Sequence, residues 1–409
     1  MIMAQQNGRN IPKEDKIFGA NSRGKARAEE IGKENVTIAT IGSLLNDDGT
    51  LAVMSSVVDV LKSLAPADYA DYAPIGGTPG FKEAIKKAAF LDYVPNRNME
   101  VVATPGGTGA LRNTVSNYSK PGDKVLTSDW FWAPYRTIAQ EQGRDIDTYT
   151  LFDETGKFNI KSFGEKVNGL LENQDSLVIF LNTPAHNPTG YSLSDEDWKK
   201  VIAVLNDATK ADKKVILFVD VAYIDFAGDP KEYRSFLPIL EELGEKVLPI
   251  IGYSASKTFT MYGMRCGAMI CLAPNKEIAD EFKLLNEFSS RGSWSNCTKA
   301  SQVLIDKIYA DEELLAKVDK ERVEFREMLI KRGSAFDAAL REEGVEGVPF
   351  DAGFFACIAC DDPDAIAAEL EKLNVFAVAL AKGIRVSVAS ISEEKCKLVA
   401  QALGKVLKK

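Results

Sequence analysis

The sequence places two charged residues where buried strands are expected to end. Lys257 follows the apolar run 247–251, and a lysine stripped of water has the lowered pKa that an amine needs to form a Schiff base. Asp220 closes the apolar run 214–219, where a carboxylate is costly unless a cation pairs with it. Each also has a plain structural interpretation, since the lysine could extend to the surface and the aspartate could cap a helix or form an ion pair.

Two turns after other apolar runs offer uncharged donors. Asn187 lies in an Asn-Pro-Thr-Gly segment after the run 177–181, where it either only shapes a turn or also donates its amide to a ligand. The glycine-rich segment 104–111 follows the run 101–103 and opens a helix, where free backbone N–H groups suit a phosphate. This segment is not the Gly-x-Gly-x-x-Gly dinucleotide fingerprint.

Each segment is ambiguous alone, but together they place a phosphate cradle, an amide donor, a carboxylate and a lysine at the ends of strands. Ligands of α/β sheets bind outside the carboxyl ends of the strands. Pyridoxal 5'-phosphate needs all four groups, because its aldehyde bonds a lysine, its ring nitrogen pairs with a carboxylate and its phosphate needs a cradle. We therefore predict this cofactor.

The elements that would position these groups alternate from about residue 46 to residue 274. The apolar runs are rich in Val, Ile and Leu and nearly continuous, as in the buried strands of a parallel sheet. Helical stretches separate them, and one begins at Ser194, where Asp197 completes a capping box. The pattern predicts an α/β fold with strands at 101–103, 124–127, 177–181, 214–219, 247–251 and 266–272, and a helix at 80–90.

The pattern changes after residue 274, and a chain of 409 residues is too long for one ordinary core. Residues 275–343 are expected to be almost entirely helical, and a smaller α+β unit follows. Its expected strands are 354–360, 375–378 and 385–389, and its expected helices are 363–373 and 392–407. The residues before about 46 are expected to form an extended arm. We predict three segments: 1–45, an N-terminal arm and part of the small domain; 46–295, the large cofactor-binding domain; and 296–409, the small C-terminal domain.

The composition excludes several classes of function. The single histidine, His186, rules out multi-histidine metal sites, so we expect no metal. A net charge of −9 argues against a nucleic-acid partner. No apolar run is long enough to span a bilayer and the N-terminus has no apolar signal core, so we expect a cytoplasmic protein without a membrane partner. Cys357 and Cys360 form a Cys-x-x-Cys pair, which could indicate redox chemistry or a zinc site. However, positions three apart on a strand face opposite sides, which disfavours both roles.

With these motifs in this order, the sequence resembles the class I pyridoxal-phosphate aminotransferases, particularly the aspartate and aromatic amino acid group, over roughly residues 35 to 409. The resemblance implies the aspartate aminotransferase-like fold (fold type I), with a mostly parallel central sheet. It also implies that Lys257 is the Schiff-base lysine and that Asp220 binds the pyridinium nitrogen. Tyr223 and Asn187 would donate to the cofactor's 3'-oxygen, and Trp130 would stack on its ring.

The resemblance also implies residues for the phosphate and the substrate. Gly107 and Thr108 match the phosphate-binding turn, and Ser254 and Arg265 match further phosphate ligands. Tyr72 is similar to a tyrosine that reaches the phosphate of a neighbouring subunit. Arg385 is similar to the arginine that binds the substrate α-carboxylate, and Gly42 matches a glycine of the flexible segment over the site. Arg291 is similar to an arginine that the partner subunit donates to the distal carboxylate of aspartate or glutamate.

Together these residues imply transamination between an aspartate, glutamate or aromatic amino acid and a 2-oxo acid such as 2-oxoglutarate, by a ping-pong mechanism. The roles of Tyr72 and Arg291 imply a homodimer with shared sites. A β-lyase, a decarboxylase or an aminotransferase of other specificity would use the same cofactor residues. A second alternative is a regulatory protein that kept the fold, which would be expected to carry a DNA-binding domain. A third alternative is a generic α/β binding protein.

The sequence departs from the family pattern in three places. The lysine motif contains Thr260 and Cys266 where a smaller or aliphatic residue is usual. The histidine that often follows the stacking tryptophan and lies behind the aspartate is absent, because Trp132 and Ala133 stand there. The usual Pro-Pro after the Ser-Asn segment is replaced by the pair 297–298. These departures affect the prediction of the substrate more than the prediction of the reaction type.

Overall fold

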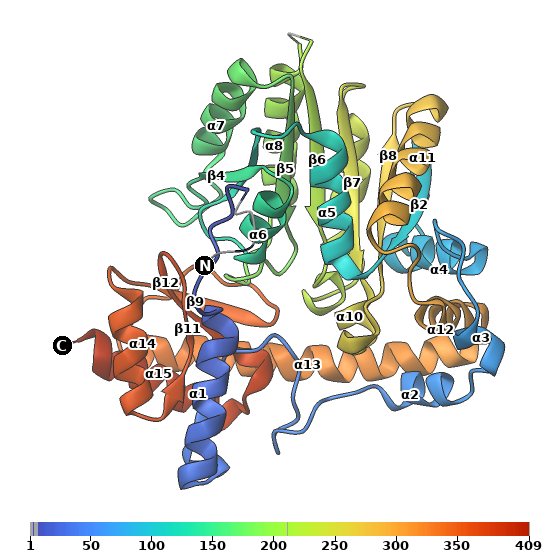
Figure 1. Ribbon diagram of the computed structural model, residues 1–409. Coiled ribbons are helices and arrows are strands. Elements are labelled where there is room, and N and C mark those ends of the chain that lie inside the picture. Colours follow the sequence, from blue (N-terminus) through green and yellow to red (C-terminus); the bar gives the residue numbers. More distant parts are fainter. Residues whose placement is uncertain (1–2, 4–6, 211, 409) are drawn as a thin grey trace.

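The computed structural model describes residues 3, 7–210 and 212–408 (Figure 1). Within this part of the chain, a seven-stranded sheet has the order β2-β8-β7-β6-β5-β3-β4. Neighbouring strands from β7 to β4 run parallel, and β8 is antiparallel to both of its neighbours. The strands are β2 (Asn98–Thr104), β3 (Lys124–Ser128), β4 (Asp145–Tyr149), β5 (Ser176–Asn182), β6 (Lys214–Asp220), β7 (Val247–Ser254) and β8 (Gly267–Ala273). This is the mostly parallel α/β sheet that the sequence predicts.

The strands are apolar because helices cover both faces of the sheet. On one face, Val178 and Phe180 of β5 pack with side chains from α5 (Gly106–Tyr118), α6 (Pro134–Glu141) and α11 (Lys276–Ser293). On the other, Leu177 and Ile179 share a core with α4 (Pro79–Phe90), α7 (Ile160–Asn173), α8 (Asp195–Ala208) and α12 (Lys299–Ala310). A strand buried on both faces cannot alternate polar and apolar residues, which explains its continuous apolar run.

The edge strand β4 is absent from the sequence prediction. It pairs only with β3, and its residues Asp145, Asp147 and Thr148 are partly exposed. An edge strand that faces water on one side carries no continuous apolar run, so the signal used for the other strands is missing. The capping box of α8 is confirmed, because Ser194 Oγ accepts from Asp197 N (3.2 Å) and Asp197 Oδ2 accepts from Ser194 N (3.1 Å).

A second group of elements packs around a smaller core. The strands β11 (Val378–Ala379), β12 (Gly383–Ser387) and β9 (Phe355–Ala359) form an antiparallel sheet, and β1 (Thr37–Ile38) pairs parallel with β10 (Val375–Phe376). The helices α14 (Pro363–Lys372) and α15 (Glu393–Leu407) lie in this part of the molecule (Figure 1). Both cysteines of the Cys-x-x-Cys pair are free thiols, and Cys357 Sγ lies 3.2 Å from the Pro188 carbonyl.

The expected extended arm is wrong for residues 16–31, which form the helix α1 (Lys16–Ile31). Asp15 caps this helix by accepting from Ile17 N and Phe18 N. Its buried face consists of small or polar residues, including Gly24, and it packs against β10. Such a face gives no apolar periodicity, so the sequence pattern did not reveal the helix.

The 31-residue helix α13 (Glu312–Glu342) runs along one side of the molecule and connects the two cores (Figure 1). Val318 and Leu329 pack in the core of the large sheet, whereas Phe336 and Leu340 pack in the smaller core. The predicted three-segment division stays a prediction, and residues 1–2, 4–6, 211 and 409 of it lie outside the described residues. Within the described part, no helix is both long and apolar enough to cross a membrane.

Candidate active site

The candidate site lies at the carboxyl ends of three adjacent parallel strands, β5, β6 and β7. Asn182, Asp220 and Gly252 are aligned across these strands in register. Asn182 Nδ2 donates to the Asp220 carbonyl at 2.8 Å, which joins the ends of β5 and β6. The segments that follow the three strands carry Asn187, Tyr223 and Lys257, so the topology brings together residues far apart in the sequence.

Lys257 lies in the short helix α10 (Ala255–Thr258) directly after β7 and is half-buried. Burial lowers the pKa of its amine to about 8; the Asp220 carboxylate opposes this shift and the Arg265 guanidinium adds to it. Nζ lies 5.4 Å from the centre of the Tyr223 ring. An amine with this pKa can lose its proton near neutral pH, as a nucleophile and a proton carrier must.

Asp220 ends β6 and is 7% exposed. Burial raises the pKa of its carboxyl, while hydrogen bonds from Tyr135 and the Ala222 amide, together with the charge of Lys257, act in the opposite direction. Oδ2 accepts from Tyr135 Oη at 2.6 Å and Oδ1 accepts from Ala222 N at 3.2 Å. The carboxylate is thus held in place, near enough to Lys257 for the two charges to interact.

Asn187, Tyr223 and Arg385 form a connected polar group beside this pair. Asn187 Nδ2 donates to Tyr223 Oη at 3.2 Å, and Asn187 Oδ1 accepts from Arg385 Nη1 at 3.5 Å. Arg385, on β12, is 3% exposed and also donates from Nη2 to the Thr40 carbonyl at 2.7 Å. Its Nε has no hydrogen-bond partner within the described chain, and burial lowers the pKa of its guanidinium. A buried cation with a free donor is suited to an anionic ligand.

The predicted phosphate turn is close to β7 and to the segment after Lys257. Gly106 has φ +72°, and a Cβ there would lie 2.6 Å from Arg265 Nη2. A Cβ on Gly107 would lie 3.7 Å from the Ser254 Cβ. Arg265, in the left-handed region at φ 48°, donates to Ser256 Oγ at 3.4 Å. Thr108 is exposed at the start of α5.

Two further predicted residues lie where the smaller core meets the site. Trp130 is buried, and a Cβ on Gly383 of β12 would lie 2.9 Å from its Cη2. A Cβ on Gly42 would lie 2.6 Å from the Phe355 Cζ, and the Phe355 ring centre is 4.3 Å from the Arg385 guanidinium carbon. The Phe355 ring therefore lies against both the Gly42 segment and the Arg385 guanidinium.

His186, next to Asn187, is buried and uncharged. Burial lowers the pKa of its imidazole to about 3, and its Nδ1 lies 2.8 Å from Thr189 Oγ1. Such a group does not carry protons near neutral pH.

The structure does not bring all of the predicted residues together in one chain. Tyr72 is 82% exposed, and Arg291, in the last turn of α11, is exposed and donates to Ser295 Oγ at 2.6 Å. Three contacts of the site were not foreseen from the sequence: Tyr135 on Asp220, the Thr40 carbonyl on Arg385, and the Phe355 ring under Arg385. None of the three belongs to a motif, so no sequence signal marked them.

The residues present fit pyridoxal 5'-phosphate. The donor set has a depressed-pKa amine, a buried carboxylate beside it, and a buried arginine with an orphaned Nε. The turn at Gly106 and Gly107 leaves room that a side chain would fill, next to Ser254 and the Arg265 guanidinium. An aldehyde, a ring nitrogen and a phosphate each find a chemically matched group there.

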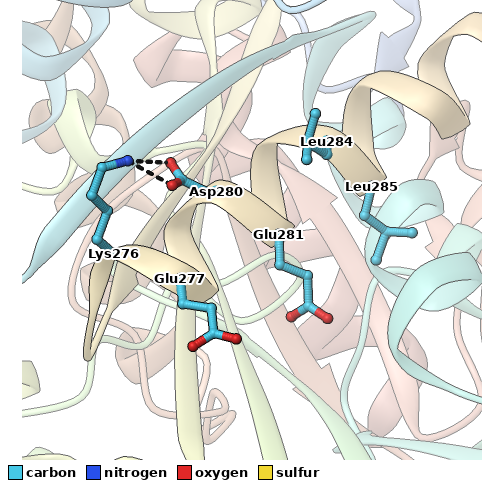
Figure 2. Close-up of a pocket in the computed structure, with 6 residues that line it drawn as sticks. All are labelled: Lys276, Glu277, Asp280, Glu281, Leu284 and Leu285. Atoms are coloured by element: carbon cyan, nitrogen blue, oxygen red, sulfur yellow. Dashed lines mark hydrogen bonds and ion pairs between the residues drawn. The ribbon is translucent and has the colours of Figure 1, made fainter.

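A separate surface hollow lies on α11 (Figure 2). It is lined by Lys276, Glu277, Asp280, Glu281, Leu284 and Leu285. Lys276 Nζ pairs with Asp280 at 2.6 Å, and the charged residues of the hollow are exposed. An open hollow does not remove water from a reacting group, so the strand ends are the better candidate.

The chain is similar to known proteins over most of its length. The family model for aminotransferase class I and II matches residues 36–403. The chain is 25% identical over 384 residues to the aromatic-amino-acid aminotransferase of Escherichia coli, covering 90% of this chain and 92% of that protein. It is 24% identical over 411 residues to an aspartate aminotransferase of Pseudomonas aeruginosa, covering 96% and 97%.

Two solved structures are similar over nearly the whole chain. An aminotransferase from Anaerococcus prevotii has a TM-score of 0.97 and 36% identity, and 100% of both chains is covered. An aromatic-amino-acid aminotransferase from Burkholderia pseudomallei, covalently bound to pyridoxal phosphate, has a TM-score of 0.82 and 23% identity, covering 99% of this chain and 100% of that one. The second likeness shows a shared fold.

Proposed function

Because the chain belongs to the class I and II aminotransferases, we propose that it transfers the amino group of an acidic or aromatic amino acid to a 2-oxo acid such as 2-oxoglutarate. We propose pyridoxal 5'-phosphate as its cofactor and a ping-pong order of the two half-reactions. The observation that carries the proposal is Lys257, whose pKa burial lowers to about 8, beside the buried carboxylate of Asp220.

When bound, pyridoxal phosphate supplies an electron-withdrawing ring that stabilises negative charge at the substrate Cα. Asp220 would accept a hydrogen bond from the ring nitrogen, and Tyr223 and Asn187 would donate to the 3'-oxygen. The turn at Gly107 and Thr108, with Ser254 and Arg265, would hold the phosphate. Trp130 would stack on the ring.

Lys257 would hold and move the proton of the reaction. Its Nζ would take the proton from the substrate Cα as a general base and give it up again as a general acid. A pKa of about 8 suits both directions, because neither the charged nor the neutral amine is rare at physiological pH.

Arg385 would bind the substrate α-carboxylate through its planar guanidinium, which favours bidentate contact. Its position over Phe355 and its bonds to Thr40 and Asn187 restrict its rotamers and so orient the substrate. Arg291 of a partner subunit would bind the distal carboxylate of an acidic substrate, and Tyr72 would reach the partner's phosphate. The proposal therefore includes a homodimer, which the exposure of Tyr72 and Arg291 in one chain supports.

The test is the Lys257→Ala variant, assayed with 2-oxoglutarate and either aspartate or phenylalanine. We expect glutamate formation by the native protein with at least one donor and a loss of at least about 100-fold in the variant, because the general acid–base group is gone. Lys276→Ala, which removes an exposed lysine paired with Asp280, serves as the control. Normal transamination by Lys257→Ala would contradict the assignment, as would a native protein that takes up no pyridoxal phosphate.

A further inference from the structure

Tyr135 is a buried residue that touches the proposed cofactor site through Asp220. It lies on α6, which packs against α5 and β4 (Figure 1). Its side chain is 1% exposed, and its Oη donates to Asp220 Oδ2 at 2.6 Å. This short bond joins two buried groups, so water does not compete with it.

The phenol is fixed from two sides by aromatic neighbours. Its ring centre lies 4.9 Å from that of Phe180 on β5 and 5.6 Å from that of Trp132, which meets it edge-on. Phe180 in turn packs on Phe218 of β6, the strand that ends in Asp220. Rings packed on two sides restrict the rotamer of Tyr135, and the observed rotamer points the hydroxyl at the carboxylate.

No histidine can take this position. The chain has one histidine, and His186 bonds Thr189 instead. Residues 132 and 133, where the resemblance leads one to expect a supporting histidine, are Trp132 and Ala133. The support comes instead from Tyr135, the second residue of α6.

We propose that Tyr135 is a positioning residue that occupies Oδ2 of Asp220 and holds this carboxylate, in its ionised form, for the ring nitrogen of pyridoxal phosphate. The inference rests on the proposed cofactor. A hydrogen bond to an ionised acceptor is stronger than one to a neutral acid, so the phenol favours the form of Asp220 that can pair with a protonated ring nitrogen. Burial and the nearby carboxylate hold the pKa of Tyr135 well above its ordinary value, so the phenol keeps its proton.

The test compares Tyr135→Phe with the native protein, both prepared without cofactor and then titrated with two ligands. The ligands are pyridoxal phosphate and its 1-deaza analogue, in which a C–H group replaces the ring nitrogen. We expect pyridoxal phosphate to bind about 10-fold to 100-fold more weakly to the variant, the range for a hydrogen bond to a charged group. The analogue cannot pair with Asp220, so its dissociation constant should be the same for both proteins.

Tyr149→Phe is the matched control, because Tyr149 is an equally buried tyrosine packed on Phe158 and Phe163. It should leave both dissociation constants unchanged. Should Tyr135→Phe not fold, 3,5-difluorotyrosine at position 135 keeps the ring and the hydroxyl and makes the phenol a stronger donor, at the cost of two added fluorine atoms. A change in affinity for pyridoxal phosphate alone would then support the proposal.

Two results would overturn it: equal losses for both ligands, which indicate a general packing defect, or no loss for either ligand. These results would leave the aminotransferase assignment intact. A native protein that does not bind pyridoxal phosphate would instead refute the proposed cofactor, and this inference with it.

Discussion

Burial moves the pKa values of Lys257 and Asp220 toward each other. It lowers the pKa of the amine to about 8 and raises that of the carboxyl. At neutral pH, the free-energy difference between the charged and the neutral form of each group is therefore smaller than in water. Each group can gain or lose a proton at a lower cost. Arg385 adds a third buried charge, held by Thr40 and Asn187 but with Nε left for a ligand.

His186 provides a pH test at the residue scale. Its folded-state pKa is about 3 and its ordinary value is 6.5, so the unfolded chain binds the extra proton between these values. The free energy of unfolding must then fall as the pH drops from 6.5 toward 3, by at most about 1.4 kcal/mol per pH unit. In His186→Gln this contribution is absent, so the stability difference between the native protein and the variant should shrink with acidification.

Urea-unfolding midpoints at pH 7, 6 and 5, at one fixed cofactor concentration, measure that difference. Other titrating groups are common to both proteins and cancel. A difference that stays constant across these pH values would show that the histidine is not buried and neutral as described.

At the scale of elements, the close pairing of β6 and β7 sets the distance between Asp220 and the lysine segment. Gly252 of β7 is aligned with Asp220, and a Cβ at Gly252 would lie 2.2 Å from Phe218 Cζ. Since Phe218 is fully buried, its ring cannot move into solvent. Because Gly252 has no side chain, β7 can pack closely on Phe218 of β6, and this close packing keeps the lysine segment near Asp220.

Gly252→Ala is expected to destabilise the protein by about 1–3 kcal/mol, because the added methyl overpacks a filled core. It should also weaken binding of pyridoxal phosphate, since Phe218 and Asp220 share a strand. Gly169→Ala is the control: Gly169 lies in α7, nothing lies within 4 Å of its Cβ position, and the helix should gain up to about 1 kcal/mol. The urea-unfolding midpoints of the two variants measure these changes in stability. Equal effects of the two substitutions would show that the core around Gly252 is not tightly packed.

At the scale of the whole molecule, the site draws on two cores joined by α13. Arg322 of this helix donates from Nε to the Thr258 carbonyl, next to Lys257, and Arg332 donates from Nη1 to the Ala389 carbonyl, in the turn that follows β12. The same helix thus contacts the lysine segment and the part of the chain that carries Arg385. Tyr72 and Arg291 remain at the surface of the single chain, as residues that serve a partner's site would.

Hybrid dimers test whether sites are shared. Lys257→Ala and Arg291→Ala proteins are unfolded and refolded separately and as a mixture, and aspartate transamination is measured. If Arg291 acts in the partner's site, the mixture should recover activity, because one site of each hybrid combines an intact Lys257 with an intact Arg291. If both residues act within one chain, no site is restored and the mixture should be no more active than the sum of its parts.

Most of the sheet was predictable because its strands are buried on both faces and therefore carry continuous apolar runs, as in 177–181 and 214–219. β4 and α1 were missed for the opposite reason, since a partly exposed strand and a helix that buries small residues carry no such pattern. The expected strand 375–378 divides into β10 and β11, which pair with different partners, and this division depends on β1 and β12.

Residue types and turn motifs, taken from the sequence alone, were enough to predict pyridoxal-phosphate chemistry. A lysine and a carboxylate after apolar runs, an Asn-Pro-Thr-Gly turn and a glycine-rich turn are local features, and parallel strands bring their carboxyl ends to one edge. Only the tertiary structure decided which side chains support them: Tyr135 on Asp220, Thr40 on Arg385, and Phe355 beneath its guanidinium. These contacts join segments far apart in the chain, and packing across the sheet and between the two cores, which has no local signal, selects them.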